Sequence, residues 1–322
     1  MLKPVRRRTK TLPIAVLGLL LVVNAVLLVL VLSNRSITGQ PASAVSTTQA
    51  APPISQLPST ALTPQPKSSS SETTTSSTEP TKLARGERLL LATSPRSAWR
   101  ATVGDCSTAG TVERSTDAGK SWRRVVKSRL APIVALGSES GEDFYAIGGT
   151  GKNCSTRYVF YDRDGTPTAS TNNPMGLWYP TPNDRDEVNG PGNNKSRPCK
   201  DQIVGLAADS SSALVACADG AVMIARGGGK EWREFISEAQ PLALASTGNG
   251  RYWLATRSDD CDGIAVRHLV ITNSDFTRGP KRCAPALDIG AGEVALDVHG
   301  STVWLWAGSK VHLSIDSGRT WS

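Results

Sequence analysis

One unit recurs through the last two-thirds of the chain and limits which folds it can adopt. Each copy is an apolar stretch, a short polar turn and a second apolar stretch that carries aromatic residues. Apolar runs on both sides of a turn rich in Gly, Ser, Asn or Asp are typical of β-hairpins. The copies start 44, 70, 39 and 52 residues apart, which predicts a repeat protein built of strands. They span 89–104, 133–148, 203–220, 242–257 and 294–308.

A third element follows three of these units and contains a defined turn. Two copies have the pattern Ser-x-Asp-x-Gly-x-x-Trp, and one copy keeps only the Gly and the Trp. In such a turn the acid binds backbone N–H groups, Gly takes a positive φ, and Trp folds back to bury apolar area. We therefore expect these residues to be structural. They are Ser115, Asp117, Gly119 and Trp122; Ser314, Asp316, Gly318 and Trp321; and Gly229 and Trp232.

This pattern resembles the Asp-box, or bacterial-neuraminidase repeat, of propellers of the sialidase, sortilin and photosystem-assembly-factor kinds. The resemblance covers residues 83–322 and implies four-stranded blades, with the box between the third and fourth strands. We therefore predict an all-β fold, a β-propeller of about five blades in a range of five to seven. A divergent blade in 160–200 would raise the count. We also expect Thr81–Glu87 to supply the fourth strand of the last blade and close the ring.

The N-terminal segments predict a membrane anchor. Residues 1–11 form a basic tail, and residues 12–32 form an apolar run without charge, which as a helix spans the hydrocarbon core of a membrane. Five positive charges precede the run and only Arg35 follows it closely, so the N-terminus is expected in the cytoplasm. The alternative is a cleaved signal peptide, whose apolar region is shorter. Both interpretations place the bulk of the chain outside the cytoplasm.

The segment 33–82 predicts a disordered linker between this helix and a folded domain at 83–322. Of its 50 residues, 29 are Ser, Thr or Pro, so it has little apolar surface to bury. The net charge of +8 is concentrated before the folded domain, because the basic tail and the linker carry most of it. A nucleic-acid partner needs positive charge gathered on the folded surface, so we expect none.

The six cysteines predict disulfide bonds, since all of them follow the predicted membrane segment and an even number in an oxidising compartment usually pairs. Fifteen pairings are possible. Cys106 and Cys154 occupy similar places in neighbouring units, which favours a bond between two blades. Cys261 with Cys283 is the second expected pair. Cys199 with Cys217 then remains, at the base of a long loop.

The sequence contains no recognisable catalytic set. Sialidases resemble one another in an Arg-Ile-Pro motif and a Tyr/Glu nucleophile pair. Arg-Ile-Pro is absent here, and no Glu stands out as a partner for a tyrosine. The three histidines, His268, His299 and His312, lack the spacing of metal ligands. We therefore predict no catalytic residues, no metal and no cofactor.

The long gap between the second and third units is the predicted partner-binding region. Insertions in a repeat protein map to loops on one face, and Met175, Leu177, Trp178 and Tyr179 are of the kind enriched in binding hot spots. The alternative is that Trp178 packs within a blade. We predict a non-catalytic binding or assembly module at a bacterial cell envelope, single-pass anchored, that binds an envelope protein. The alternatives are a cell-wall glycan-binding protein, with Trp178 and Tyr179 stacking on sugars, and a divergent glycoside hydrolase.

Overall fold

The computed structural model describes residues 85–126, 129–139, 141–172, 174, 176–238, 240–272, 276–285, 289 and 292–322. The predicted tail, membrane helix and linker lie outside these residues. In the described part, no helix has the length and apolarity to cross a membrane, and the only helical element is a short 3-10 helix, η1 (Asp259–Cys261).

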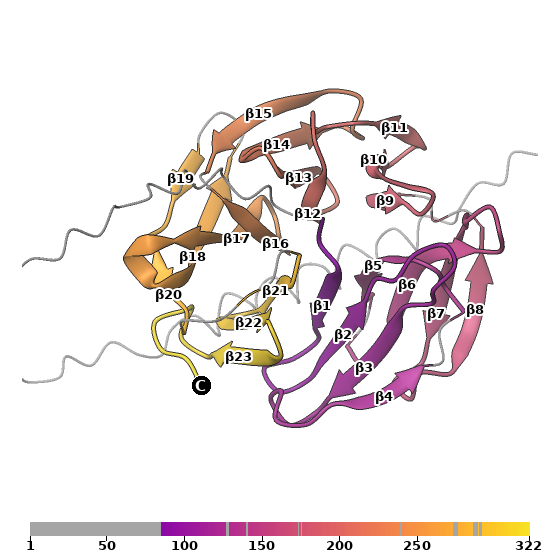
Figure 1. The fold of residues 1–322 in the computed structure, drawn as a ribbon, viewed down its shortest axis with the longest axis horizontal. Coiled ribbons are helices and arrows are strands. Elements are labelled where there is room, and N and C mark those ends of the chain that lie inside the picture. Colours follow the sequence, from indigo (N-terminus) through magenta and orange to yellow (C-terminus); the bar gives the residue numbers. More distant parts are fainter. Residues whose placement is uncertain are drawn as a thin grey trace, which may run out of the picture. The chain divides into compact units, whose positions relative to one another are not determined.

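Six antiparallel sheets surround a central axis and form a six-bladed β-propeller (Figure 1). The prediction of about five blades is corrected to six. The first sheet contains β1 (Arg88–Ala92), β2 (Ala98–Thr102), β3 (Thr111–Ser115) and β4 (Arg123–Val126). The second contains β5 (Ile133–Gly137), β6 (Phe144–Thr150), β7 (Ser155–Tyr161) and β8 (Pro167–Thr171). The third contains β9 (Tyr179–Thr181), β10 (Asp184–Gly190) and β11 (Asn194–Ser196).

The other three blades continue in the same way around the ring. The fourth contains β12 (Ile203–Ala208), β13 (Ser212–Cys217), β14 (Ala221–Arg226) and β15 (Trp232–Ser237). The fifth contains β16 (Pro241–Gly248), β17 (Arg251–Ser258), β18 (Gly263–Ile271) and β19 (Phe276–Arg278), with β20 (Arg282–Cys283) also paired to β18. The sixth contains β21 (Val294–His299), β22 (Thr302–Ala307) and β23 (Lys310–Ser314).

The core lies between neighbouring blades, because each sheet turns its two faces towards the sheets beside it. Trp99 of blade 1 is fully buried, and its ring lies 4.0 Å from that of Phe144 in blade 2. Trp304 of blade 6 is also fully buried and packs with Ala92 and Trp122 of blade 1. Contacts of this kind close the ring between its first and last blades.

The two ends of the channel that runs along the axis differ in what surrounds them. We call the end where β1, β5, β12, β16 and β21 begin the disulfide face, because all three disulfides lie there. These bonds join Cys106 to Cys154, Cys199 to Cys217 and Cys261 to Cys283, with Cα–Cα distances of 5.5, 5.5 and 5.1 Å. We call the end where these strands finish the turn face.

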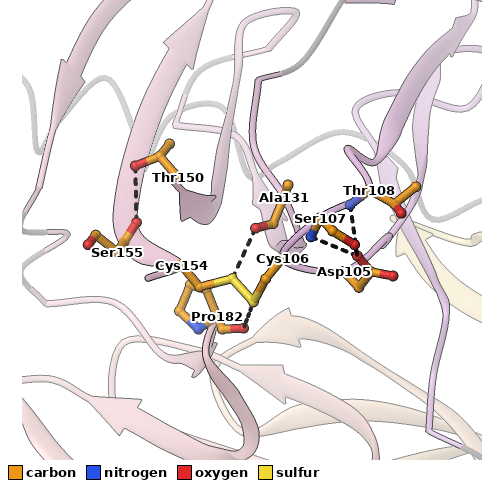
Figure 2. Close-up of a disulfide and its surroundings, with 9 residues drawn as sticks. All are labelled: Asp105, Cys106, Ser107, Thr108, Ala131, Thr150, Cys154, Ser155 and Pro182. Atoms are coloured by element: carbon orange, nitrogen blue, oxygen red, sulfur yellow. Dashed lines mark hydrogen bonds between the residues drawn. A yellow bond between two sulfur atoms is a disulfide. The ribbon is translucent and has the colours of Figure 1, made fainter. Parts of the chain in front are cut away.

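All three predicted cysteine pairings are confirmed. The Cys106–Cys154 bond links blades 1 and 2 near Pro182 of blade 3 (Figure 2). Beside it, the Asp105 carboxylate accepts the N–H groups of Ser107 and Thr108 at 2.8 and 2.7 Å, which fixes the loop that carries Cys106. The Cys199–Cys217 bond joins blades 3 and 4, and the Cys261–Cys283 bond lies within blade 5.

Blade 3 occupies the region in which a divergent blade was expected, and its direction is reversed. Pro182, after β9, lies beside Gly149 on the disulfide face, whereas Trp178, before β9, lies against Gly229 on the turn face. In each blade we call the strand nearest the axis the inner strand: β1, β5, β9, β12, β16 and β21 (Figure 1). The inner strand β9 therefore runs opposite to the other five. It is only three residues long, so it lacks the apolar stretch that marks the repeat.

The two complete Ser-Asp-Gly-Trp turns have the expected hydrogen bonds. In the first, Ser115 Oγ accepts the N–H of Gly119 at 3.0 Å and donates to Asp117 at 2.8 Å. In the second, Ser314 Oγ accepts the N–H of Gly318 at 2.7 Å and donates to Asp316 at 2.8 Å. The two glycines have φ of 80° and 82°, a conformation that favours Gly.

Each of these turns, and the incomplete one, contacts the preceding blade. A Cβ added to Gly119 would lie 3.2 Å from Cζ3 of Trp304 in blade 6, and one at Gly318 would lie 3.2 Å from Val266 in blade 5. At the incomplete turn, a Cβ on Gly229 would lie 2.5 Å from Trp178 in blade 3. The turns therefore contribute to the packing between blades.

In the described residues, the predicted closing strand is not found beside β23. The described part of that segment, residues 85–87, pairs with Gly292 and Val103 near the axis rather than with β23. Beside β23, Leu313 and Ser322 exchange two backbone hydrogen bonds of 3.1 and 2.9 Å. The partners of residues 85–87 come from blades 1 and 6 near the axis, and the strand count alone does not indicate them.

Acid should destabilise the protein partly through the two turns. Hydrogen bonds, chiefly from the Ser121 side chain and from the Thr320 backbone, lower the pKa of Asp117 and of Asp316 from 3.8 to about 2. The folded state thus favours the ionised acids, and their contribution to stability is present above pH 3.8 and lost as the pH falls towards 2.

We therefore expect the double variant Asp117→Asn, Asp316→Asn to lose less stability than the natural protein between pH 4 and pH 2. Denaturant titrations at fixed pH values measure this, with Asp164→Asn in an exposed turn as the matched control. Equal pH dependence in the double variant and the natural protein would show that the prediction is wrong.

Candidate functional site

A cavity of about 720 Å³ occupies the axis of the propeller and is the candidate site. It is lined by the inner strands β1, β5, β12, β16 and β21 and by residues around β9. This volume lies in the range of pockets that hold small ligands or single side chains of a partner. We call this cavity the central channel.

The segment Arg85–Glu87 lies across the channel at the disulfide face. Glu87 donates to Gly292 of blade 6 and accepts from Val103 of blade 1, both at 3.0 Å. A Cβ added to Gly86 would lie 2.4 Å from the carbonyl oxygen of Val204, in the blade opposite β1. The segment can be followed in Figure 1, where it passes from β1 to β12. Glycine at position 86 is therefore required by close backbone approach.

Ion pairs hold this segment, and they give the arginines beside it at the disulfide face acidic partners. Arg85 pairs with Asp186. Arg185 pairs with Glu87 at 3.1 Å and donates to the carbonyl of Gly86.

A third arginine at the disulfide face is held in the same way. Arg88 pairs with Glu293 at 3.3 Å, and its guanidinium carbon lies 4.5 Å from the centre of the Trp306 ring. All three arginines that line the channel thus have an acidic partner, and their charges are balanced at the disulfide face.

The turn face of the channel is lined by polar residues at the ends of the inner strands. Glu139 and His299 are exposed there. Asp209 accepts the N–H groups of Ser211, Ser212 and Gly250 at 2.7–2.8 Å, so its carboxylate is engaged in holding two turns. Tyr145 reaches over Gly137, where an added Cβ would lie 2.2 Å from its ring.

Asp297 is an acid on the channel wall. It lies on β21, is partly exposed, and that exposure is to the channel. Its Oδ2 accepts the backbone N–H of Ala92 at 2.6 Å, which joins the inner strands of blades 6 and 1. Burial raises its pKa to about 7, and the N–H groups of Ala92 and Val298 offset this only in part. The group therefore changes charge near neutral pH.

The predicted partner-binding residues lie in the interior where they are described. Met175 lies outside the described residues. Trp178 is 8% exposed and Tyr179 is 5% exposed, and Leu177 is partly buried against the cluster that contains Tyr158 and Tyr179. Trp178 packs edge-on against Trp232 with ring centres 5.8 Å apart. A partner could not stack on Trp178 or Tyr179 in this arrangement, and the alternative, packing within the blades, describes their positions.

Sequence reasoning did not identify Asp297, and it assigned Arg85–Glu87 to a closing strand rather than to the channel. For Asp297 a signal existed: the residue after the leucine of each inner strand is Ala92, Gly137, Ala207 or Ala245 in the other copies of the unit. An Asp in this series breaks the pattern. For residues 85–87 no signal existed, because their partners come from distant parts of the chain. In the described residues, no group of three His, Cys, Asp or Glu is placed to bind a metal.

Comparisons with known proteins assign no family to this chain. No family model and no curated protein matches the sequence. The chain is similar to the structure of YCF48 bound to D1 peptide, with 14% identity over 74% of this chain and 82% of that one, and a TM-score of 0.37. The chain is also similar to the Aleuria aurantia lectin in complex with Fucα1-6GlcNAc. The identity is 11% over 76% of this chain and 96% of that one, and the TM-score is 0.44.

The Hadza microbial sialidase Hz136 is also similar, with 14% identity, 73% of this chain, 57% of that chain and a TM-score of 0.34. All three comparisons involve low identity and a low TM-score. They assign neither a ligand nor a reaction to this protein.

Replacing Trp178 should destabilise the fold. Trp178→Ala leaves a cavity between blades 3 and 4, and removing a buried Trp costs about 3 kcal/mol or more of unfolding free energy. Denaturant titration measures this, with Trp178→Phe expected to lose less. An unchanged unfolding free energy for Trp178→Ala would contradict the interior position.

Asp297 should make the protein less stable as the pH rises. Because its folded pKa of about 7 exceeds its usual 3.8, the folded state favours the protonated acid; that contribution is fully present below pH 3.8 and is lost as the pH rises through 7.

We expect Asp297→Asn, which keeps an acceptor for Ala92, to flatten the fall in unfolding free energy between pH 4 and pH 8. Asp164→Asn, in an exposed turn, is the control and should behave as the natural protein does. A fall as steep in Asp297→Asn as in the natural protein would exclude Asp297 as its source.

Proposed function

We propose that this protein is a membrane-anchored, extracytoplasmic binding module of the bacterial cell envelope, and that it binds its partner at the turn face of the central channel. The observation that carries the proposal is the channel itself. It has the volume of a ligand site, a short segment lies across one end, and polar side chains surround the other.

The location outside the cytoplasm is supported by the cysteines. All six are paired in three disulfides, which persist in oxidising compartments and are rare in the cytosol. The apolar run 12–32 and the positive charges before it are the basis for the proposed anchor.

The choice of the turn face follows from how the chain enters the domain. Arg85–Glu87 leads into β1 at the disulfide face and makes contacts with blades 1, 3, 4 and 6 there. A ligand entering from that side would have to displace these contacts and break ion pairs. Among the described residues, the turn face offers the less obstructed approach.

A non-catalytic role is favoured by the state of two channel acids, Asp209 and Asp297. Glycoside hydrolysis usually needs two carboxyl groups on opposite sides of the scissile bond. Asp209 already accepts three backbone N–H groups, and Asp297 accepts that of Ala92. Both acids therefore have structural tasks.

The two complete Ser-Asp-Gly-Trp turns are proposed to be Asp-boxes with a structural role.

Glycan binding remains the alternative, with a different aromatic residue from those predicted. Tyr145 lines the channel close to Glu139 and Ser138, and aromatic side chains next to polar groups can hold a sugar ring. Trp178 and Tyr179 are too buried for this task.

In-cell photo-crosslinking of the full-length chain tests the proposed site. One probe replaces His299, at the turn face, and a control probe replaces the exposed Arg233 on the outer strand β15. We expect a discrete adduct from the His299 probe that the Arg233 probe does not give. The added change Ser210→Trp, also at the turn face, should abolish it.

Absence of an adduct specific to the His299 probe, or its persistence with Ser210→Trp, would overturn the proposal. A discrete envelope protein in the adduct supports a protein partner, and a wall glycan supports the alternative. Thermal unfolding of each variant confirms that the fold is retained.

A further inference from the structure

The Asp297 carboxylate stands alone among small apolar residues at one level of the channel. Four other inner strands place Ala92, Gly137, Ala207 and Ala245 after their last leucine, and all of them line the channel. An acid here has no packing advantage over alanine, and burial disfavours its charge. The backbone N–H groups of Ala92 and Val298 donate to this side chain, but neither bond requires a carboxylate, since an amide oxygen would also accept them.

The charge of Asp297 has no counterpart in the part of the structure that is described. No Lys, Arg or His nitrogen of the described residues forms an ion pair with it. The arginines of the channel lie at the disulfide face and have acidic partners of their own. From Asp297 to the turn face the described lining contains the acids Glu139 and Asp209 and no Lys or Arg. The open part of the channel therefore favours a cation.

The wall around Asp297 is aliphatic. Leucines of the inner strands line the channel beside the series of small residues: Leu91, Leu136, Leu206, Leu244 and Leu296. Burying the methylene groups of a ligand against such a wall makes the free energy of binding more favourable. A bound ion must lose its hydration, so a cation without an apolar stem would gain less here than one that carries a stem.

We propose that the central channel binds a primary ammonium group carried on an unbranched alkyl stem, with the Asp297 carboxylate as its counter-charge. A lysine side chain of a partner and a free alkyl diamine share this chemistry. The inference rests on the proposed function in that it names what the channel binds. An ion pair in this enclosed site is stronger than one at the surface, because the effective dielectric constant is lower.

Calorimetric titration of the full-length protein in detergent, with 1-aminohexane as the probe, tests the proposal. The neutral matched probe is 1-hexanol, and the variants are Asp297→Asn and the exposed control Asp164→Asn. We expect 1-aminohexane to bind the natural protein and Asp164→Asn equally. Loss of the charge, in the probe or at Asp297, should weaken binding about tenfold or more.

Ser210→Trp, which leaves Asp297 intact, is the second variant and should also abolish binding if the probe enters from the turn face. It keeps the test valid if Asp297→Asn does not fold. Binding of 1-aminohexane that is unchanged by Asp297→Asn, or no tighter than that of 1-hexanol, would overturn the proposal, as would no binding at all. The crosslinking result is independent of these outcomes, so the proposed function can stand when the ammonium site fails.

A lysine side chain and a free diamine are then distinguished by two further probes. An Nα-acetyl-lysine amide, which keeps the side-chain ammonium, supports a protein or peptide source if it binds the natural protein but not Asp297→Asn. Cadaverine (1,5-diaminopentane) that binds while the lysine derivative does not supports a free diamine.

Discussion

Packing between neighbouring blades is the interaction on which the rest of the structure depends. A sheet with two apolar faces is stable only when both are covered, and in a ring each blade covers one face of the next. Here the covering side chains are large: Trp99 packs against Phe144, Trp304 against blade 1, and Trp178 against Trp232. Because blade 6 covers blade 1, the ring leaves neither of them with an uncovered apolar face.

The glycine turns determine how closely the blades approach. Gly119, Gly318 and Gly229 each face the preceding blade at a distance that leaves little or no room for a side chain. At Gly119 and Gly318, hydrogen-bonded Ser and Asp side chains hold the turn in the conformation that brings Gly to this surface. At blade 4 the Ser and Asp are missing, and Trp178 with Trp232 supplies the contact by ring packing instead. Two chemically different solutions therefore meet the same requirement for a filled space between blades.

The channel follows from this arrangement, and its two ends differ electrostatically. At the disulfide face, acids and arginines are paired around Arg85–Glu87, so the charges offset one another over short distances. Along the wall towards the turn face, Asp297 is placed among aliphatic residues, and its elevated pKa reflects the cost of charge in such surroundings. A binding partner that brings a positive charge would lower that cost. Asp297 thus joins the inner strands of blades 6 and 1 through its hydrogen bond with Ala92, and it also places a carboxyl group in the channel.

The sequence by itself determined the repeat, the strands and the disulfides. Hairpin units and Ser-Asp-Gly-Trp turns depend on local spacing, which a sequence displays directly, and the cysteines pair as their places in the units indicate. Only the tertiary structure decided the sixth blade, because β9 is short and reversed and carries no repeat signal. It alone decided that Trp178 lies inside, since exposure depends on neighbours from other blades. It also placed Arg85–Glu87 across the channel and gathered Asp297 with the inner strands, because residues far apart along the chain meet only when the ring closes.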